Sequence, residues 1–91
     1  MIECHIVVTN RLGLHARAAA RLVRTASEFS CVIKIVRADK SANADAKSIL
    51  SVLMLAAGRG TELHLTADGA DEAEALNVVC NLFADNFGEQ S

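Results

Sequence analysis

The chain passes from the periodicity of a strand to that of a helix within one short loop, and this change constrains the fold most. Residues 2–8 alternate with the two-residue period of a half-buried strand. Residues 16–28 follow the spacing of a helix, and one buried stripe is predicted from Ala19, Leu22, Val23 and Ala26. The loop at 9–14 must lead directly from one element to the other, which leaves His15 at or next to the helix N-cap.

His15 is therefore expected beside unpaired backbone donors. The first turn of a helix has N–H groups without intrahelical partners, and the helix dipole adds partial positive charge, so this end favours anions. The same charge disfavours an imidazolium, and we expect His15 to be a neutral nucleophile near pH 7. Arg17 supplies a forked donor group, and Gly13 permits a tight turn. A histidine near a helix start is often only a cap, but this combination predicts a phosphoryl group held on nitrogen.

Three further strands are predicted from the rest of the chain. The β-branched segment 31–37 predicts the second strand, and a turn at 39–41 leads into a short third strand that ends near Ala46. Residues 61–67 alternate again and predict a fourth strand with one exposed face.

Two more helices complete the pattern. Ser48 is a typical N-cap for a short helix. We expect this helix to end soon after Ala57, because Gly58-Arg59-Gly60 terminates it. Most of its apolar side chains are expected in the core, with some left exposed. Asp71 and Glu74 match a capping box at the start of the last helix. Its buried stripe is predicted to consist of Ala73, Leu76, Val79, Cys80 and Phe83. Residues 88–91 are predicted to form a frayed tail.

The resulting order, β-α-β-β-α-β-α, with strands exposed on one face, predicts an α+β open-faced sandwich. We expect residues 1–91 to form one domain. No segment reaches the ~18 apolar residues of a membrane span, and the first residues lack the layout of a signal peptide, so a cytoplasmic protein is predicted. The three cysteines, Cys4, Cys31 and Cys80, show no CxxC spacing. They are expected to be small buried hydrophobic residues in a reducing compartment, without metal or redox roles.

Three short motifs together resemble the HPr phosphocarriers of the bacterial phosphoenolpyruvate-dependent phosphotransferase system. In chain order they are Gly13-Leu14-His15-Ala16-Arg17, Lys47-Ser48-Ile49-Leu50 and Gly69-Ala70-Asp71-Glu72. The resemblance spans essentially the whole chain and implies a four-stranded antiparallel sheet with three helices on one face. It also implies a carrier that accepts phosphoryl groups from Enzyme I and passes them to IIA-type acceptors, without cofactor, metal or membrane.

The resemblance assigns roles to individual residues. His15 would accept the phosphoryl group through Nδ1, Arg17 would stabilise it, and Ser48 matches the serine that a dedicated ATP-dependent kinase modifies in many bacteria. The family usually has proline where this chain has Ala18, a difference that concerns the rigidity of the helix start rather than the chemistry. The loop at 10–13 and the stretch Leu53-Met54-Leu55 look closest to the branch that serves a nitrogen-related phosphorelay, which leaves open whether the chain feeds sugar transport or a regulatory relay.

Docking is expected around His15. The charge is asymmetric: residues 1–47 hold eight basic and four acidic groups, and residues 48–91 hold one basic and seven acidic groups. Arg17, Arg21 and Arg24 share one helix face, which spacing alone assigns equally well to solvent or to an acidic partner. Their position below His15 favours docking. The predicted partner-binding residues are Leu14, Ala20, Arg21, Arg24, Lys47, Ile49, Leu50 and Leu53.

Other function classes are less favoured. One alternative is a regulatory binding module of a nitrogen-type phosphorelay that acts on partner proteins rather than on sugar uptake. A second is a regulatory binding module in which Ser48 and not His15 matters, although the presence of His15 argues against that as the only role. A nucleic-acid-binding domain is disfavoured by a pI near 5.8 and by three aromatic residues, all Phe, outside the predicted strands. An autonomous enzyme is disfavoured because no carboxylate pair or nucleotide loop is present. A zinc site at His5 and His64 is disfavoured because no third ligand is evident. The protein is expected to be a monomer.

Overall fold

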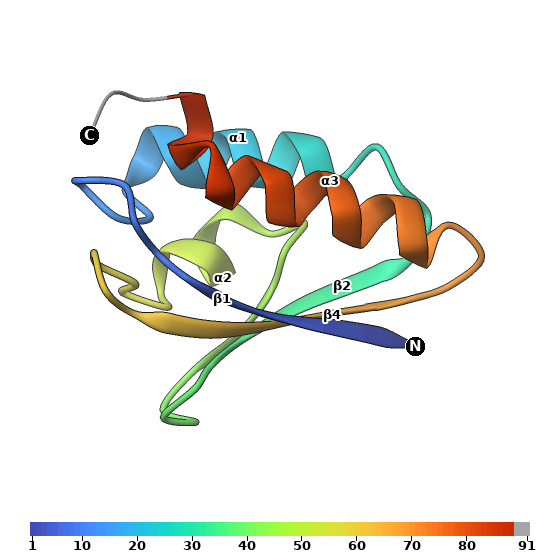
Figure 1. The fold of residues 1–91 in the computed structure, drawn as a ribbon, viewed down its shortest axis with the longest axis horizontal. Coiled ribbons are helices and arrows are strands. Elements are labelled where there is room, and N and C mark those ends of the chain that lie inside the picture. Colours follow the sequence, from blue (N-terminus) through green and yellow to red (C-terminus); the bar gives the residue numbers. More distant parts are fainter. Residues whose placement is uncertain (89–91) are drawn as a thin grey trace.

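The strands form one antiparallel sheet in the order β1-β4-β2-β3 (Figure 1). In this computed structural model, which describes residues 1–88, β1 (Ile2–Val7) and β3 (Asn43–Asp45) lie at the two edges. The central strands are β4 (Glu62–Asp68) and β2 (Val32–Arg37). All three pairings are antiparallel. The helical connections make β1 parallel to β2 and β3 parallel to β4, but neither of these pairs is adjacent, because β4 lies between β1 and β2, and β2 lies between β4 and β3.

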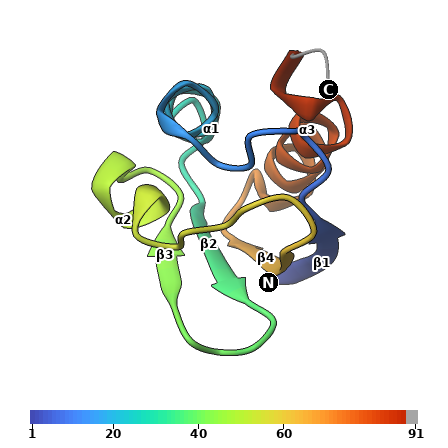
Figure 2. The ribbon, with the colours of Figure 1, turned by 90° about the vertical axis from the view of Figure 1, so that its left-hand side faces the viewer.

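All helices cover the same face of this sheet (Figures 1 and 2). The helices α1 (Ala16–Ala26) and α3 (Glu72–Ala84) lie across the sheet, and the short α2 (Ile49–Leu53) lies beside β3. A 3₁₀ turn, η1 (Asn86–Gly88), follows α3. The predicted α+β open-faced sandwich is thus confirmed. None of the helices in the described part of the chain is long and apolar enough to cross a membrane.

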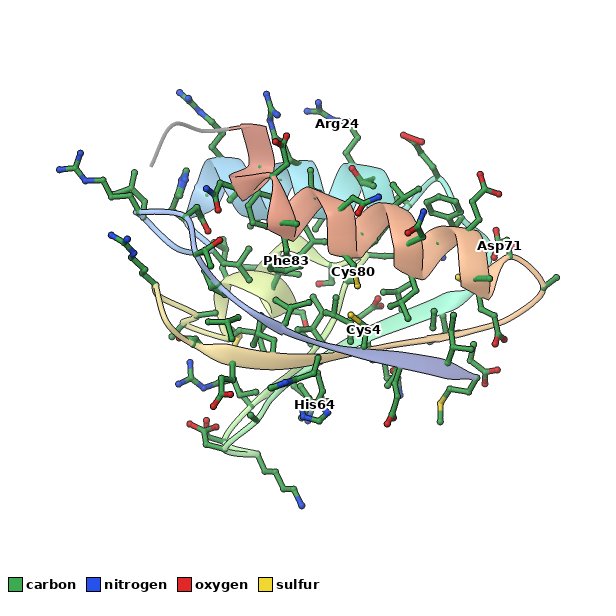
Figure 3. The ribbon with its side chains drawn as sticks, in the orientation of Figure 1. Cys4, Arg24, His64, Asp71, Cys80 and Phe83 are labelled. Carbon is green, nitrogen blue, oxygen red and sulfur yellow. The ribbon has the colours of Figure 1, made fainter. Side chains whose placement is uncertain are left out.

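The strand alternation builds the core as predicted. Ile33 and Ile35 of β2 and Leu63 and Leu65 of β4 are fully buried below the helices. Each such side chain contributes about 1.5–3 kcal/mol on burial. On the opposite face of the same strands, the side chain of His64 is exposed (Figure 3).

The helix α2 is shorter and more exposed than predicted. It ends at Leu53 rather than near Ala57, and of its apolar side chains only Val52 is buried. The expectation that most of them lie in the core is wrong. The helix cannot continue to Ala57 because Ala56 has a left-handed φ of +51°. Arg37 Nη1 holds this turn by donating hydrogen bonds to the carbonyl oxygens of Leu55 and Ala56, at 2.9 and 3.1 Å.

The predicted capping box at the start of α3 is wrong. The Asp71 side chain makes no capping bond, and Glu74 is exposed. The Asp71 carboxylate instead accepts hydrogen bonds from the backbone N–H groups of Ser30 and Cys31, at 2.9 and 3.0 Å. These bonds join α3 to the segment before β2 and fix the rotation of the helix. Ala75 is consequently buried and the predicted Ala73 is exposed.

The end of α3 is anchored to α1. The Phe87 side chain is buried and packs edge-on against Phe83, with ring centroids 4.8 Å apart. The carbonyl oxygen of Phe87 accepts a hydrogen bond from Arg21 Nη1 at 2.9 Å. The predicted fraying concerns residues 88–91, of which 89–91 lie outside the described residues.

Stability should fall in acid, in part through Asp71. The pKa of Asp71 is lowered mainly because the Ser30 N–H donates to its carboxylate, and that of Glu72 is lowered mainly by the Gly69 N–H. A carboxyl group with a depressed folded pKa stabilises fully above its ordinary pKa, and this contribution is lost as the pH falls through the lower value. We expect the urea midpoint to drop below about pH 4. Asp71→Asn should flatten this drop, whereas Glu74→Gln on the same helix should leave it unchanged.

Candidate functional site

His15 is the N-cap of α1, as predicted. Its backbone is extended (φ −76°, ψ 178°), and its carbonyl accepts the first helical hydrogen bond from Ala19 N at 2.8 Å. Its side chain turns back over the helix start, where Nδ1 accepts a hydrogen bond from the Arg17 N–H at 3.3 Å. A ring nitrogen that accepts a hydrogen bond carries no proton. The Nδ1 lone pair is therefore directed at the positive end of the helix.

Gly13 allows the loop before His15 to approach the segment after α2. It has a left-handed φ of +65°, and a Cβ at this position would lie 2.5 Å from the Ala57 carbonyl oxygen and 2.7 Å from Gly58 Cα. The next residue, Leu14, donates its N–H to the same Ala57 oxygen at 2.8 Å. Only glycine meets both the conformational and the spatial requirement. The loop of His15 and the chain leaving α2 are thereby fixed together.

Asn10 holds this loop from inside, and sequence reasoning did not identify it. Its side chain is only 1% exposed, and its Nδ2 donates to the Gly13 carbonyl oxygen at 2.7 Å. The Gly13 N–H in turn donates to the Asn10 carbonyl oxygen at 3.1 Å. A turn asparagine is common in loops, and nothing in the sequence distinguishes this buried one from an exposed one. Asn10 is a positioning residue for the site.

The three arginines lie on the exposed side of α1, but they are not equivalent. The Arg17 guanidinium makes no hydrogen bond or ion pair within residues 1–88, so it is available to an incoming anion. Arg21 is committed to the Phe87 carbonyl. The Arg24 side chain points away from the sheet (Figure 3). It lines a hollow between α1 and α3 together with Arg21, Thr25 and Leu82.

An apolar surface covers α2. We call it the α2 patch; it consists of Ile49, Leu50, Leu53 and Met54, which are 42%, 71%, 36% and 77% exposed. Met54 was not among the predicted docking residues, and neither was Leu12, which is 67% exposed in the loop before His15. In the sequence, each is only an apolar residue beside a turn, and this pattern indicates a docking surface weakly. Contiguous exposed apolar groups of this kind mark interaction sites.

Three other predicted docking residues contribute less side-chain surface. Leu14 is 6% exposed and belongs to the core, because the turn at Gly13 directs it inward, and it is therefore not available to a partner. Ala20 is half-buried. Lys47 is also half-buried, and its Nζ donates to the Phe29 carbonyl oxygen at 2.6 Å.

Ser48 is the N-cap of α2, as predicted. Its Oγ accepts a hydrogen bond from Ser51 N at 3.4 Å, and its carbonyl accepts the Val52 N–H at 3.0 Å. The residue is half-buried and is followed directly by Ile49 and Leu50 of the α2 patch. A charge added to this hydroxyl would lie at the edge of that surface.

The two remaining histidines lie opposite one another on the open face of the sheet. The rings of His5 and His64 have centroids 4.7 Å apart, and His5 Nε2 lies 3.7 Å from Glu62 Oε1. Within residues 1–88, no group of three His, Cys, Asp or Glu side chains is arranged to hold a metal ion. These histidines lie on the face opposite the helices, whereas His15 begins a helix.

Comparison with known proteins gives one consistent family. The family model described as the PTS HPr component phosphorylation site matches residues 2–85. A phosphocarrier protein HPr from Pseudomonas aeruginosa is 48% identical over 98% of each chain. The structure of HPr-C-His from Thermoanaerobacter tengcongensis is 40% identical, with a TM-score of 0.93 over 100% of both chains. An HPr dimer structure from that organism is 39% identical, with a TM-score of 0.76 over 98% of this chain and 100% of that chain.

Proposed function

This chain belongs to the HPr family of phosphotransferase-system phosphocarriers, and we propose that Nδ1 of its His15 accepts a phosphoryl group from Enzyme I and passes it to IIA-type acceptors. The observation that carries this proposal is the hydrogen bond from the Arg17 N–H to His15 Nδ1. This hydrogen bond directs the Nδ1 lone pair toward the backbone N–H groups at the start of α1, which would also bind the phosphoryl oxygens.

The chemistry of the carrier follows from this geometry. The Nδ1 lone pair attacks phosphorus, a nitrogen–phosphorus bond forms, and the bond from phosphorus to the donor breaks. The Arg17 N–H then loses its ring acceptor and becomes available to a phosphoryl oxygen, together with the other unpaired N–H groups of the first turn of α1. The Arg17 guanidinium adds forked donors to the dianion. The protein holds the group and transfers it, and the proposed role needs no cofactor and no autonomous catalysis.

The proposal is tested by phosphorylation with phosphoenolpyruvate and Enzyme I, followed by intact mass measurement. We expect a gain of one acid-labile phosphoryl group in the wild type and in His5→Ala and His64→Ala. His15→Ala should gain none and should keep the thermal stability of a folded protein. Phosphorylation of His15→Ala, or loss of phosphorylation in either control variant, would contradict the proposal. Supplying Enzyme I from a sugar branch and from a nitrogen branch in parallel identifies the branch that this chain serves.

We assign docking to the exposed side of α1 and the α2 patch. Arg24 provides an unburied charge toward an acidic partner, and Leu50 and Met54 provide the most exposed apolar side chains. Electrostatic attraction accelerates association and is weakened by salt, whereas apolar contacts limit dissociation. We propose a cytoplasmic monomer; light scattering behind gel filtration should give one chain of 9.7 kDa.

Ser48 is proposed as the regulatory residue, through a kinase and phosphorylase specific for serine. A phosphate adds about −1.5 to −2 charge at pH 7, at the edge of a surface that partners must desolvate. Ser48→Asp should therefore slow phosphoryl uptake by His15 about tenfold or more, equivalent to about 1.4 kcal/mol or more. Uptake rates from limiting Enzyme I measure this effect.

The matched control is Ser48→Asn, which has the shape of the aspartate and also caps helices well, but carries no charge. It should phosphorylate at nearly the wild-type rate. Thermal melts of both variants should show folded proteins, because either side chain can accept the bond from Ser51 N. Equal uptake by the two variants would leave Ser48 as a helix cap only.

A further inference from the structure

Two of the cysteines, far apart in the sequence, meet between the sheet and the last helix (Figure 3). Cys4 lies on β1 and Cys80 on α3, 76 positions later, and their Sγ atoms are 2.7 Å apart. The Cys80 thiol donates to Cys4 Sγ, and the Cys4 thiol lies 3.9 Å from the His5 carbonyl oxygen. Both residues are half-buried, whereas Cys31 is buried.

The separation of these sulfurs differs little from that of a covalent pair. A disulfide has a sulfur–sulfur distance of about 2.05 Å, so the atoms need to approach by about 0.7 Å. One sulfur is carried by an edge strand and the other by a helix packed on it, and side-chain rotation can supply this movement. The third cysteine, Cys31, is 2% exposed and has no sulfur partner within the described residues.

We propose that Cys4 and Cys80 are a site of reversible oxidation, forming an intramolecular disulfide when the protein meets an oxidant of the peroxide class. The Cys4 thiolate attacks the peroxide oxygen, which gives a sulfenic acid and hydroxide. Cys80 sulfur then attacks the Cys4 sulfur, and the sulfenic hydroxyl leaves with the Cys80 proton as water. Two thiols and one hydrogen peroxide thus give one disulfide and two water molecules. This role departs from the redox-inactive one predicted for these cysteines, and it does not depend on the phosphocarrier function.

The surroundings assign the order of these steps. Burial, together with the hydrogen bond to Cys4, raises the pKa of Cys80 to about 12, so that this sulfur stays protonated at neutral pH. A thiol reacts with peroxide as its thiolate, which makes Cys80 the second sulfur to act rather than the first. Burial also raises the pKa of Cys31, which protects that thiol from the same oxidant.

The disulfide would tether the N-terminal strand to the last helix. Closing so long a segment restricts the unfolded chain, and a bridge of this span should raise the melting temperature by roughly 10 °C. Reduction should restore the original value.

The experiment oxidises the reduced, full-length protein with hydrogen peroxide. We expect a monomer lighter by two hydrogen atoms, with one of the three thiols still titratable and a peptide joining Cys4 to Cys80. Dithiothreitol should reverse the mass change and the gain in melting temperature. Cys31→Ala should behave as the wild type, whereas Cys4→Ser and Cys80→Ser should show neither change. Both serine variants should melt near the reduced wild type, which establishes that they fold.

Other products would overturn the proposal. These are disulfide-linked dimers, bridges that include Cys31, or addition of oxygen to separate cysteines without loss of the two hydrogens. A disulfide that lowers the melting temperature would show that the bond distorts the packing of α3 on β1, and that the native arrangement does not accommodate it.

Discussion

Gly13→Ala should destabilise the protein by roughly 2–5 kcal/mol, the largest effect expected of any single change in the loop of His15. A left-handed φ of +65° disfavours a side chain, and the added Cβ would lie 2.5 Å from the Ala57 carbonyl oxygen. That oxygen belongs to the backbone and accepts the Leu14 N–H, so it cannot move away without breaking this bond. Urea denaturation measures the loss of stability.

Two other glycines separate the conformational effect from the spatial one. Gly60 also has a positive φ, of +90°, but a Cβ there meets nothing within 4 Å, so Gly60→Ala should cost only about 1–2 kcal/mol. Gly58 has open space and no such φ, and Gly58→Ala should change stability by less than about 0.5 kcal/mol. Equal losses at Gly13 and Gly60 would show that contact with Ala57 is unimportant.

The same substitution should impair phosphoryl uptake. Because the loop places His15 at the start of α1, a loop displaced from Ala57 would move Nδ1 away from the Arg17 N–H. We expect uptake by folded Gly13→Ala, measured well below its melting temperature, to be slower than that of Gly60→Ala. Wild-type uptake by a strongly destabilised Gly13→Ala would show that the position of the loop and the chemistry are independent.

Arg17→Ala should give the second large effect, in activity rather than in stability. Its guanidinium has no partner within residues 1–88, so its removal should change the free energy of unfolding by less than about 0.5 kcal/mol. Phosphoryl uptake should slow by about tenfold or more, because the group interacts only with the charge that arrives on His15. Stopped time courses of the phosphorylated fraction measure this rate.

Two variants make the interpretation specific. Arg17→Lys keeps the charge without the forked donors and should be intermediate. Lys34→Ala removes an exposed charge from the open face of the sheet and should be without effect. At saturating carrier, the loss in Arg17→Ala should remain in the maximal rate. A loss confined to the half-saturating concentration would place Arg17 in docking instead.

Arg21 is unsuitable for a test of docking, although its predicted position below His15 favoured a docking role. Its guanidinium holds the Phe87 carbonyl, so Arg21→Glu would disturb η1 as well as any partner contact. Arg24→Glu is the cleaner charge reversal, because Arg24 is exposed and has no hydrogen bond to the backbone of η1. Weaker association at low salt is the expected result.

Features that depend on neighbours along the chain could be predicted from the amino-acid sequence. Alternation over residues 2–8 indicated a half-buried strand, and β1 has that burial pattern. The glycine-containing loop and the helical spacing after it placed His15 at an N-cap, which the structure confirms. Ser48 was identified as a cap in the same way. Such signals are local, because capping bonds and strand alternation connect residues only a few positions apart.

Contacts between residues of distant segments could be found only in the folded protein. Asp71 binds the backbone of Ser30 and Cys31 instead of capping its own helix, and Arg37 binds carbonyl oxygens in the turn after α2. The meeting of Cys4 with Cys80 depends on the packing of α3 against β1. Local patterns do not encode these pairings. Each depends on where the sheet and helices bring side chains together, which is decided by burial of the common core.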